Sequence, residues 1–311
     1  MKKLLVFTVV LSCILLGFIS VFKIEIQTFY NTLYSSNPEI SVVMATYNRE
    51  KSLPNSIQSI LNQTFKNFEL IIVDDGSRDN TAKLLYNYLK KDKRIRVYRN
   101  KRNRGIPYTR NKLLDLSRGK YMAIMDSDDY SFPIRLEEQL NYMKQHPNIM
   151  VLSSQILDID SKKDISRFWS IKGEDIAINL IFFSPLCNPS TFYNLDFIKS
   201  NHIRYDETLR TSEDYDFWRQ IFLKGGEFDL IQMPLLAYRF YHKNSKIFYQ
   251  SQKNNALNIT KKIQNVFFPT NDETEKISRC EKLKKIYETN KQLKLLKSKT
   301  IQKEIKKHCK N

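Results

Sequence analysis

Short apolar runs alternate with amphipathic segments between residues 39 and 148. The runs contain stretches such as Val42, Val43 and Met44, which suit strands buried in a sheet: EISVVMATYN, FELIIVDDGS, RIRVYRN and KYMAIMDSDD. The segments between them place apolar residues at helical spacing, and helices are expected over residues 52–65, 80–92, 107–119 and 132–148. This alternation predicts an α/β domain with a mostly parallel sheet flanked by helices.

Polar side chains follow three of these predicted strands, at the point where each strand ends. Ligands of open α/β sheets bind outside the carboxyl ends of the strands, so side chains at these ends are candidates for binding. They are Thr46, Tyr47 and Asn48 after the first strand, Asp74 and Asp75 after the second, and Asp126, Asp128 and Asp129 after the fourth.

The pattern changes at both ends of this region, which predicts the domain boundaries. After residue 150 the alternation loosens into short strands and helices, and from about residue 251 the sequence predicts Lys-rich helices. We therefore expect an N-terminal segment over residues 1–37, a folded domain over 38–250 that divides at residue 150, and a basic helical tail over 251–311.

The N-terminal segment contains an uncharged apolar stretch of 19 residues, Leu4–Phe22. This stretch is long enough to cross a bilayer, and it predicts a single-pass membrane anchor followed by a polar stalk over residues 24–37. A cleaved signal peptide is the alternative, although no small-residue cleavage site follows Phe22. Lys2 and Lys3 favour a cytoplasmic N-terminus, but Lys23 and other basic residues after the stretch leave the side of the membrane open.

The charge is strongly basic, with 51 Lys and Arg against 33 Asp and Glu and a net charge of +18. Such an excess is typical of proteins that bind nucleic acid, anionic lipid or phosphorylated substrates, and also of plain solvated helices. Nucleic acid is not expected as a partner, because the basic tail lacks regularly interleaved aromatic residues. The four cysteines are far apart and form no CxxC pair, which excludes a disulfide framework and a zinc site.

Asp126 and Asp128 are two positions apart at the end of a predicted strand. Hard cations take oxygen ligands, and Mg²⁺ usually needs only one or two carboxylates together with phosphates and water. A cation would also offset the repulsion between the aspartates in this otherwise basic chain. The alternative is that these aspartates form a turn or cap a helix.

Several motifs, in this order and spacing, resemble glycosyltransferase family 2: SVVMATYNRE, QTFKNFELIIVDDGSRDNT, NRGIPYTRN, GKYMAIMDSDD and SEDYDFW. The resemblance covers roughly residues 40–245 and implies a Rossmann-like GT-A fold, with a nucleotide-binding half over 38–150 and an acceptor half over 151–250. It implies inverting transfer of a sugar from a nucleoside diphosphate sugar, with UDP as the expected nucleotide, to a glycan or lipid-linked acceptor. The family normally uses Mn²⁺ or Mg²⁺. A non-processive enzyme is expected, because the chain has a single apolar stretch and no Q-x-x-R-W motif.

The resemblance assigns the donor site to the strand ends. Thr46 and Tyr47 are expected to line the base pocket, Asp75 to accept a hydrogen bond from the base, and Arg110 to reach the nucleotide. Asp126 is expected to hold the ribose or a metal-bound water.

The resemblance also assigns the metal and the catalytic base. Asp128 is the expected metal ligand, together with Asp126, and His242 matches a histidine near the diphosphate. Glu213 and Asp214 match the acidic pair of the family, with Asp214 as the general base. Thr211 and Ser212 are able to cap a helix that begins at this pair, and the helix dipole would hold Asp214 ionised.

Two other functions are compatible with parts of the sequence. A sugar nucleotidyltransferase also combines an α/β sheet with acidic metal ligands, but it needs a Gly-rich phosphate loop and ATYNREKSLPN contains no glycine. A non-catalytic basic binding protein would account for the tail but not for the acidic strand ends.

Overall fold

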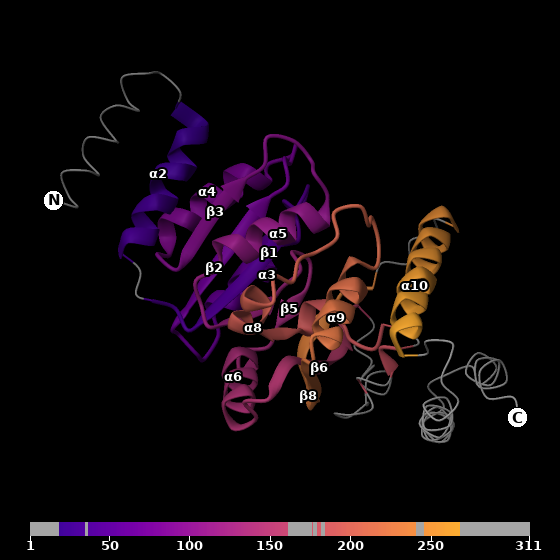
Figure 1. The fold of residues 1–311 in the computed structure, drawn as a ribbon. Helices are drawn as coiled ribbons and strands as arrows, with labels where there is room; N and C mark the ends of the chain where they lie inside the picture. The colour runs from indigo at the N-terminus through magenta and orange to yellow at the C-terminus, as the bar shows by residue number, and fades with distance from the viewer. Residues whose placement is uncertain are drawn as a thin grey trace, which may run out of the picture.

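The computed structural model describes residues 19–34, 37–160, 176, 179–181, 184–240 and 246–267. Within them lies an eight-stranded sheet with the strand order β3-β2-β1-β4-β7-β6-β8-β5 (Figure 1). Its first half is parallel, as the alternating pattern predicts, and contains β1 (Ile40–Thr46), β2 (Phe68–Asp74), β3 (Ile95–Arg99) and β4 (Tyr121–Ile124).

The second half makes the sheet mixed, so the expectation of a mostly parallel sheet holds only for the first half. The strand β7 (Phe192–Asn194) runs antiparallel to both β4 and β6 (Ile149–Asp158). The long strand β8 (Glu227–Tyr238) is parallel to β6. The two-residue strand β5 (Tyr130–Ser131) is antiparallel to β8. These strands are joined by connections of very different length, which have no regular period in the sequence.

Helices cover both faces of the sheet, and the alternation of side chains along each strand separates two cores. Val43 faces one core with Trp218, while Val42 and Met44 face the other with Leu53. The first core is covered by α5 (Ile106–Leu116), α8 (Leu195–Ser200) and α9 (Glu213–Leu223), and the second by α3 (Leu53–Leu61), α4 (Thr81–Lys91) and α6 (Arg135–Gln145).

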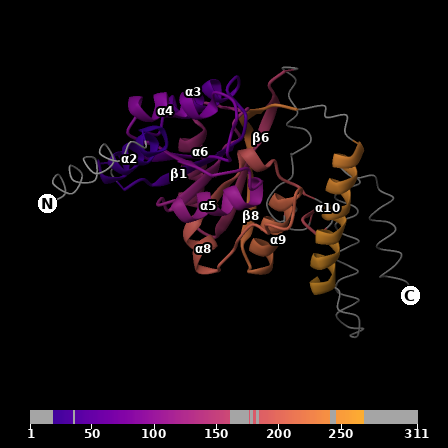
Figure 2. The same cartoon turned by 90° about the horizontal axis from the view of Figure 1, so that it is seen from above.

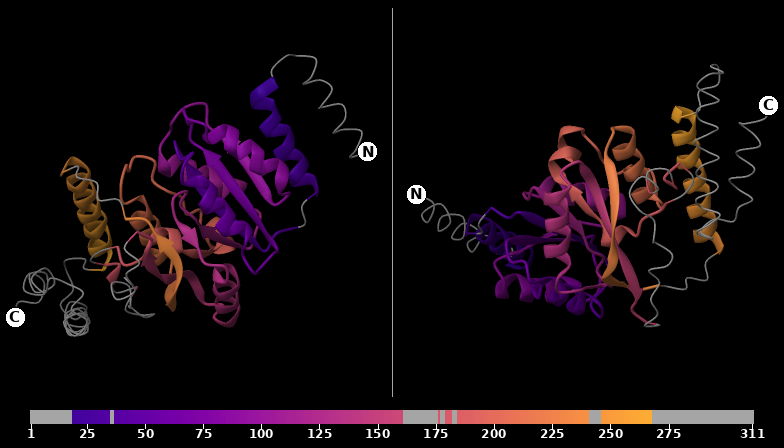
Figure 3. Two further views of the ribbon diagram at one scale, coloured as in Figure 1. Left: turned by 180° about the vertical axis from the view of Figure 1, so that it is seen from behind. Right: turned by 90° about the horizontal axis from the view of Figure 1, so that it is seen from below.

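The expected polar stalk is instead a helix that packs against the sheet. The helix α2 (Ile19–Tyr34) lies along one edge of the sheet, beside β3 (Figure 3). Its Thr28 and Asn31 are buried and bond to the backbone of β3. Most of the predicted anchor Leu4–Phe22 lies outside the described residues. Within the part of the chain that the structure describes, no helix is long and apolar enough to cross a membrane.

The helix α10 (Lys246–Phe267) crosses the boundary expected near residue 250. Its Ile259 and Ile263 are buried in the same core as Trp218, so this part of the expected tail packs on the folded domain. Figures 1 and 2 show α10 beside α9, at the end of the molecule opposite α2. Residues 268–311, the rest of the expected tail, lie outside the described residues.

Candidate functional site

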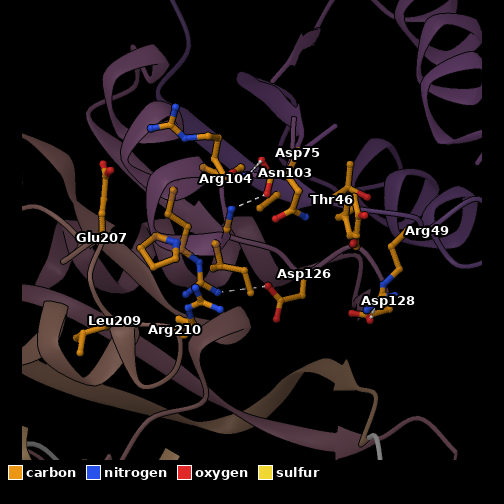
Figure 4. Close-up of a pocket in the computed structure, with 18 of the residues that line it drawn as sticks. Thr46, Arg49, Asp75, Asn103, Arg104, Asp126, Asp128, Glu207, Leu209 and Arg210 are labelled. Atoms are coloured by element: carbon orange, nitrogen blue, oxygen red, sulfur yellow. Dashed lines mark hydrogen bonds and ion pairs between the residues drawn. The ribbon is translucent and has the colours of Figure 1, made fainter. Parts of the chain in front are cut away.

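A cavity of ≈ 780 Å³ lies at the carboxyl ends of the parallel strands (Figure 4). Six of the residues expected from the sequence line it: Thr46, Tyr47, Asp75, Arg110, Asp126 and Asp128. Glu213 contacts one of them, whereas His242 lies outside the described residues. The structure therefore brings together the strand-end residues that the sequence singles out.

The register of β1 and β2 places Thr46 and Asp75 at the same edge. Thr46 is opposite Asp74, and the backbone N–H of Asp75 donates to the Thr46 carbonyl over 2.8 Å. The chain then turns at Gly76, which has a φ of 78°. A Cβ atom there would lie 2.8 Å from the backbone carbon of Arg102, so only glycine allows the two loops to approach this closely.

Asp75 organises the loop that follows β3. Its carboxylate accepts hydrogen bonds from the backbone N–H groups of Arg104 and Gly105, each 2.9 Å, and from Nδ2 of Asn100 over 2.8 Å. The sequence predicts a contact between Asp75 and a base, but its pattern does not reveal these loop partners. The carboxylate is therefore fixed in the wall of the cavity before any ligand is considered.

Asp126 and Asp128 follow β4 and lie near two arginines. Asp128 Oδ2 is 3.2 Å from Arg49 Nε, and Asp126 Oδ1 is 3.7 Å from Arg110 Nη2 (Figure 4). The pKa of Asp126 is raised to about 6: burial has the largest effect, Arg110 opposes it, and the carboxylates of Asp128 and Glu213 add to it. The cavity therefore combines carboxylates with arginines, and each of these two aspartates lies beside an arginine.

The chemistry of these side chains fits a divalent cation. The described residues contain no group of three or more His, Cys, Asp or Glu side chains that could hold a metal by themselves. Two carboxylates are sufficient when phosphate oxygens and water complete the coordination, and Asp126 and Asp128 both reach the cavity. Burial is the main cause of the raised pKa of Asp126, and a bound cation would stabilise the ionised carboxylate there.

Arg110 joins the acidic strand end to the acidic pair of α9. Its Nη1 donates to Glu213 Oε1 over 2.6 Å, and its guanidinium lies 5.6 Å from the ring centre of Tyr205. Both partners of this pair are nearly buried, with 9% and 10% of their side chains exposed. Arg110 therefore connects two segments that are 103 residues apart in the sequence, besides lining the cavity.

Asp214 is partly exposed at the start of α9, and its carboxylate accepts a hydrogen bond from the backbone N–H of Tyr215 over 2.8 Å. Its pKa is raised to about 7: burial has the largest effect, the neighbouring Glu213 adds to it, and Arg110 opposes it. This direction is opposite to the one expected from the helix dipole, because burial and the neighbouring carboxylate both raise the pKa.

The loop before α9 is held from outside by α10. Ser212 has a left-handed backbone with a φ of 60° and forms no side-chain cap; its hydroxyl donates to the Gln252 carbonyl over 3.3 Å. Asn255 Nδ2 donates to the Thr211 hydroxyl over 2.9 Å and to its carbonyl over 3.2 Å. The sequence pattern did not reveal this support, because it assigned these residues of α10 to a separate tail.

Comparison with known proteins agrees with this geometry. The family model described as Glycosyl transferase family 2 matches residues 41–202. An uncharacterized glycosyltransferase of Methanocaldococcus jannaschii is 40% identical over 213 residues, which are 67% of this chain and 73% of the relative. A second uncharacterized glycosyltransferase, from Haemophilus influenzae, is 28% identical over 274 residues, 84% of each chain.

Solved structures support the same fold. The crystal structure of a fragment of S. aureus TarS in complex with UDP-GlcNAc has a TM-score of 0.59 and 19% identity, with 80% of each chain covered. At this identity the likeness shows the fold alone. The extent of the family match and the identity to the archaeal relative together confirm the resemblance stated from the motifs, and the chain belongs to glycosyl transferase family 2.

Proposed function

We propose that the protein transfers a sugar from a UDP-sugar to an acceptor hydroxyl, with inversion and with the help of Mn²⁺ or Mg²⁺. The observation that carries this proposal is the arrangement around Arg110. This residue lies between Asp126, at the strand end suited to a metal and a diphosphate, and the acidic pair of α9. Arg110 thus links the donor-binding groups of the cavity to the acidic pair, whose Glu213 bonds to it although neither Glu213 nor Asp214 is among the lining residues.

Asp214 is the proposed general base. It removes the proton from the acceptor hydroxyl, whose oxygen forms the new bond to the anomeric carbon while the bond from that carbon to the diphosphate breaks. A pKa of about 7 suits this role, because a base titrating near the working pH is both sufficiently ionised and sufficiently basic. Glu213 holds Arg110 and is a positioning residue beside it.

The donor is bound by residues at the ends of the strands, away from α9. Tyr47 is exposed at the end of β1, where its ring is available to stack on a base, and Thr46 lies next to it. Asp126 and Asp128 would hold the cation, which supplies a positive charge against the leaving diphosphate. The UDP and UDP-GlcNAc complexes of TarS support a uridine nucleotide as the donor.

Neither alternative function gains support from the structure. The chain belongs to a family of glycosyltransferases, which leaves a nucleotidyltransferase or a non-catalytic binding protein without a supporting feature. Single-step, non-processive transfer to a glycan or a lipid-linked glycan remains our proposal for the product.

The direct test is turnover of a panel of UDP- and GDP-sugars with and without Mn²⁺. We expect one UDP-sugar to be hydrolysed in a Mn²⁺-dependent way. Asp128→Asn should reduce this rate by at least roughly 10²-fold, because the loss of a metal ligand costs more than the loss of a group that only supports a ligand. The control is Asp115→Asn, since Asp115 forms an exposed pair with Arg204 outside the cavity. Metal-independent turnover, or full activity in Asp128→Asn, would refute the assignment.

The support from α10 leads to a separate prediction. Asn255→Ala is expected to lower kcat by about fivefold, because a lost hydrogen bond worth about 1 kcal/mol loosens the loop that presents Asp214. The KM for the donor should stay unchanged, since Asn255 does not line the cavity. The control is Asn254→Ala, an exposed neighbour. An equal effect of both variants on kcat, or a change confined to KM, would contradict a positioning role.

A further inference from the structure

The helix α2 runs in the direction opposite to β3. The Thr28 hydroxyl donates to the Val97 carbonyl over 2.9 Å and accepts from the Val97 N–H over 3.2 Å. One turn further along the helix, Asn31 Nδ2 donates to the Ile95 carbonyl over 2.9 Å, which is nearer the start of β3. The first residues of α2 therefore point toward the carboxyl ends of the strands, where the cavity lies; we call this the pocket end of the sheet.

Two further interactions agree with this direction. Near the end of α2, the Thr32 carbonyl accepts from Arg118 Nη1 over 3.3 Å, and Arg118 precedes β4 at the opposite end of the sheet. Burial lowers the pKa of Lys112, and the carboxylates of Asp75 and of Glu25, which is near the start of α2, oppose this effect. The Lys112 amino group donates to Asn100 Oδ1 over 3.0 Å, at the pocket end of β3.

The apolar stretch Leu4–Phe22 overlaps the start of this helix. Because α2 begins at Ile19, the last residues of the stretch belong to the same helix as Thr28. Phe22 lies ~9 Å before Thr28 along the helix axis. From Val97, which Thr28 contacts, β3 continues for ~7 Å to its last residue. The end of the apolar stretch and the pocket end of β3 are therefore at nearly the same height.

Basic side chains gather at this height. Lys101, Arg102 and Arg104 are exposed in the loop that follows β3, and Lys23 is exposed directly after the apolar stretch. Ile106, at the start of α5, is 50% exposed beside them. A Lys or Arg near a membrane surface with acidic headgroups contributes about 1 kcal/mol to binding, so this loop suits an anionic surface.

We propose that the pocket end of the sheet faces a lipid bilayer with acidic headgroups, with Leu4–Phe22 inserted in it and the loop Asn100–Gly105 at its surface. The proposal deepens the proposed function and rests on it for the identity of the cavity. An acceptor carried by a lipid is then confined to the plane onto which the cavity opens, which raises its effective concentration. Because Ile19–Phe22 and Thr28 belong to one helix, the end of the apolar stretch is fixed relative to β3.

The test compares two lysines at opposite ends of β3. Lys101→Cys and Lys93→Cys are each made in full-length protein in which Cys13, Cys280 and Cys309 are replaced by alanine; Cys187 is buried and stays. Both lysines are exposed. Each variant carries a fluorophore on the new cysteine and is reconstituted into phosphatidylethanolamine–phosphatidylglycerol vesicles that contain a lipid with a nitroxide on its headgroup.

We expect quenching at position 101 to be at least about threefold stronger than at position 93, because the two positions are ~25 Å apart along the strand. Equal quenching at both positions, or stronger quenching at position 93, overturns the proposal. Mn²⁺-dependent UDP-sugar hydrolysis by the same protein in detergent tests the cavity independently of the membrane. Hydrolysis without the difference in quenching therefore refutes only the orientation, and the difference without hydrolysis refutes the proposed function.

Discussion

Asp214→Asn is expected to lower kcat by about 10²–10⁴-fold, the usual cost of removing a positioned general base. The affinity for the donor should be retained, because the residues proposed to bind it belong to β1, β2 and β4 and their connecting loops. Calorimetric titration with UDP and steady-state kinetics separate the two effects. An unchanged kcat with a raised donor dissociation constant would show that Asp214 binds the donor and is not the general base.

The pH dependence of the wild-type protein gives a second measurement of the same role. Because the pKa of Asp214 is raised to about 7, its ionised form is gained as the pH rises through that value, so kcat should fall on the acidic side. Glu213→Gln is the matched control: the amide oxygen can still accept from Arg110, and the loss should be smaller than for Asp214→Asn. A larger loss in Glu213→Gln would reverse the assignment.

Arg110→Met is expected to lower the free energy of unfolding by about 3–5 kcal/mol, as is typical when one partner of a buried ion pair is removed. The change leaves the Glu213 carboxylate nearly buried without the guanidinium that now bonds to it. Denaturation by urea, followed by circular dichroism, measures the loss. Arg204→Met breaks an exposed pair with Asp115 and should cost less than about 1 kcal/mol.

The double variant Arg110→Met/Glu213→Leu distinguishes the contribution of the ion pair to stability from that of side-chain packing. Replacement of both charges by apolar side chains of similar size is often close to neutral, so it should recover most of the stability lost in Arg110→Met. Its catalytic activity should nevertheless remain low, because Asp126 and the acidic pair are then no longer connected. A double variant as unstable as the single one would show that the cost comes from the cavity left by the guanidinium.

The sequence pattern predicts the first half of the fold closely. The four apolar runs contain β1 to β4, and the helices expected between them correspond to α3, α4, α5 and α6. In this half, each strand is buried on both faces and each helix has one apolar face, so local periodicity reports the structure directly. The five strand-end residues that line the cavity follow from these predicted strands, whereas Arg110 of α5 was expected only from the family resemblance.

The remaining parts of the fold and of the site depend on contacts between segments that are distant in the sequence, and local periodicity does not reveal such contacts. The pair of Arg110 with Glu213 and the bonds from Asn255 to Thr211 join residues that no local pattern connects. Likewise, Thr28 and Asn31 are polar and so predict a solvated stalk, whereas both are buried and bond to backbone groups.

The contact between α2 and β3 also protects the sheet from association. A terminal strand with free N–H and C=O groups is a template for pairing with another chain, and natural proteins cover such strands. Here the Thr28 hydroxyl satisfies both backbone groups of Val97, and Asn31 occupies the carbonyl of Ile95. Removal of residues beyond Ile19 to improve solubility would therefore expose β3 and leave its backbone groups free to pair with another chain. Shortened forms intended for crystallisation should begin before this helix.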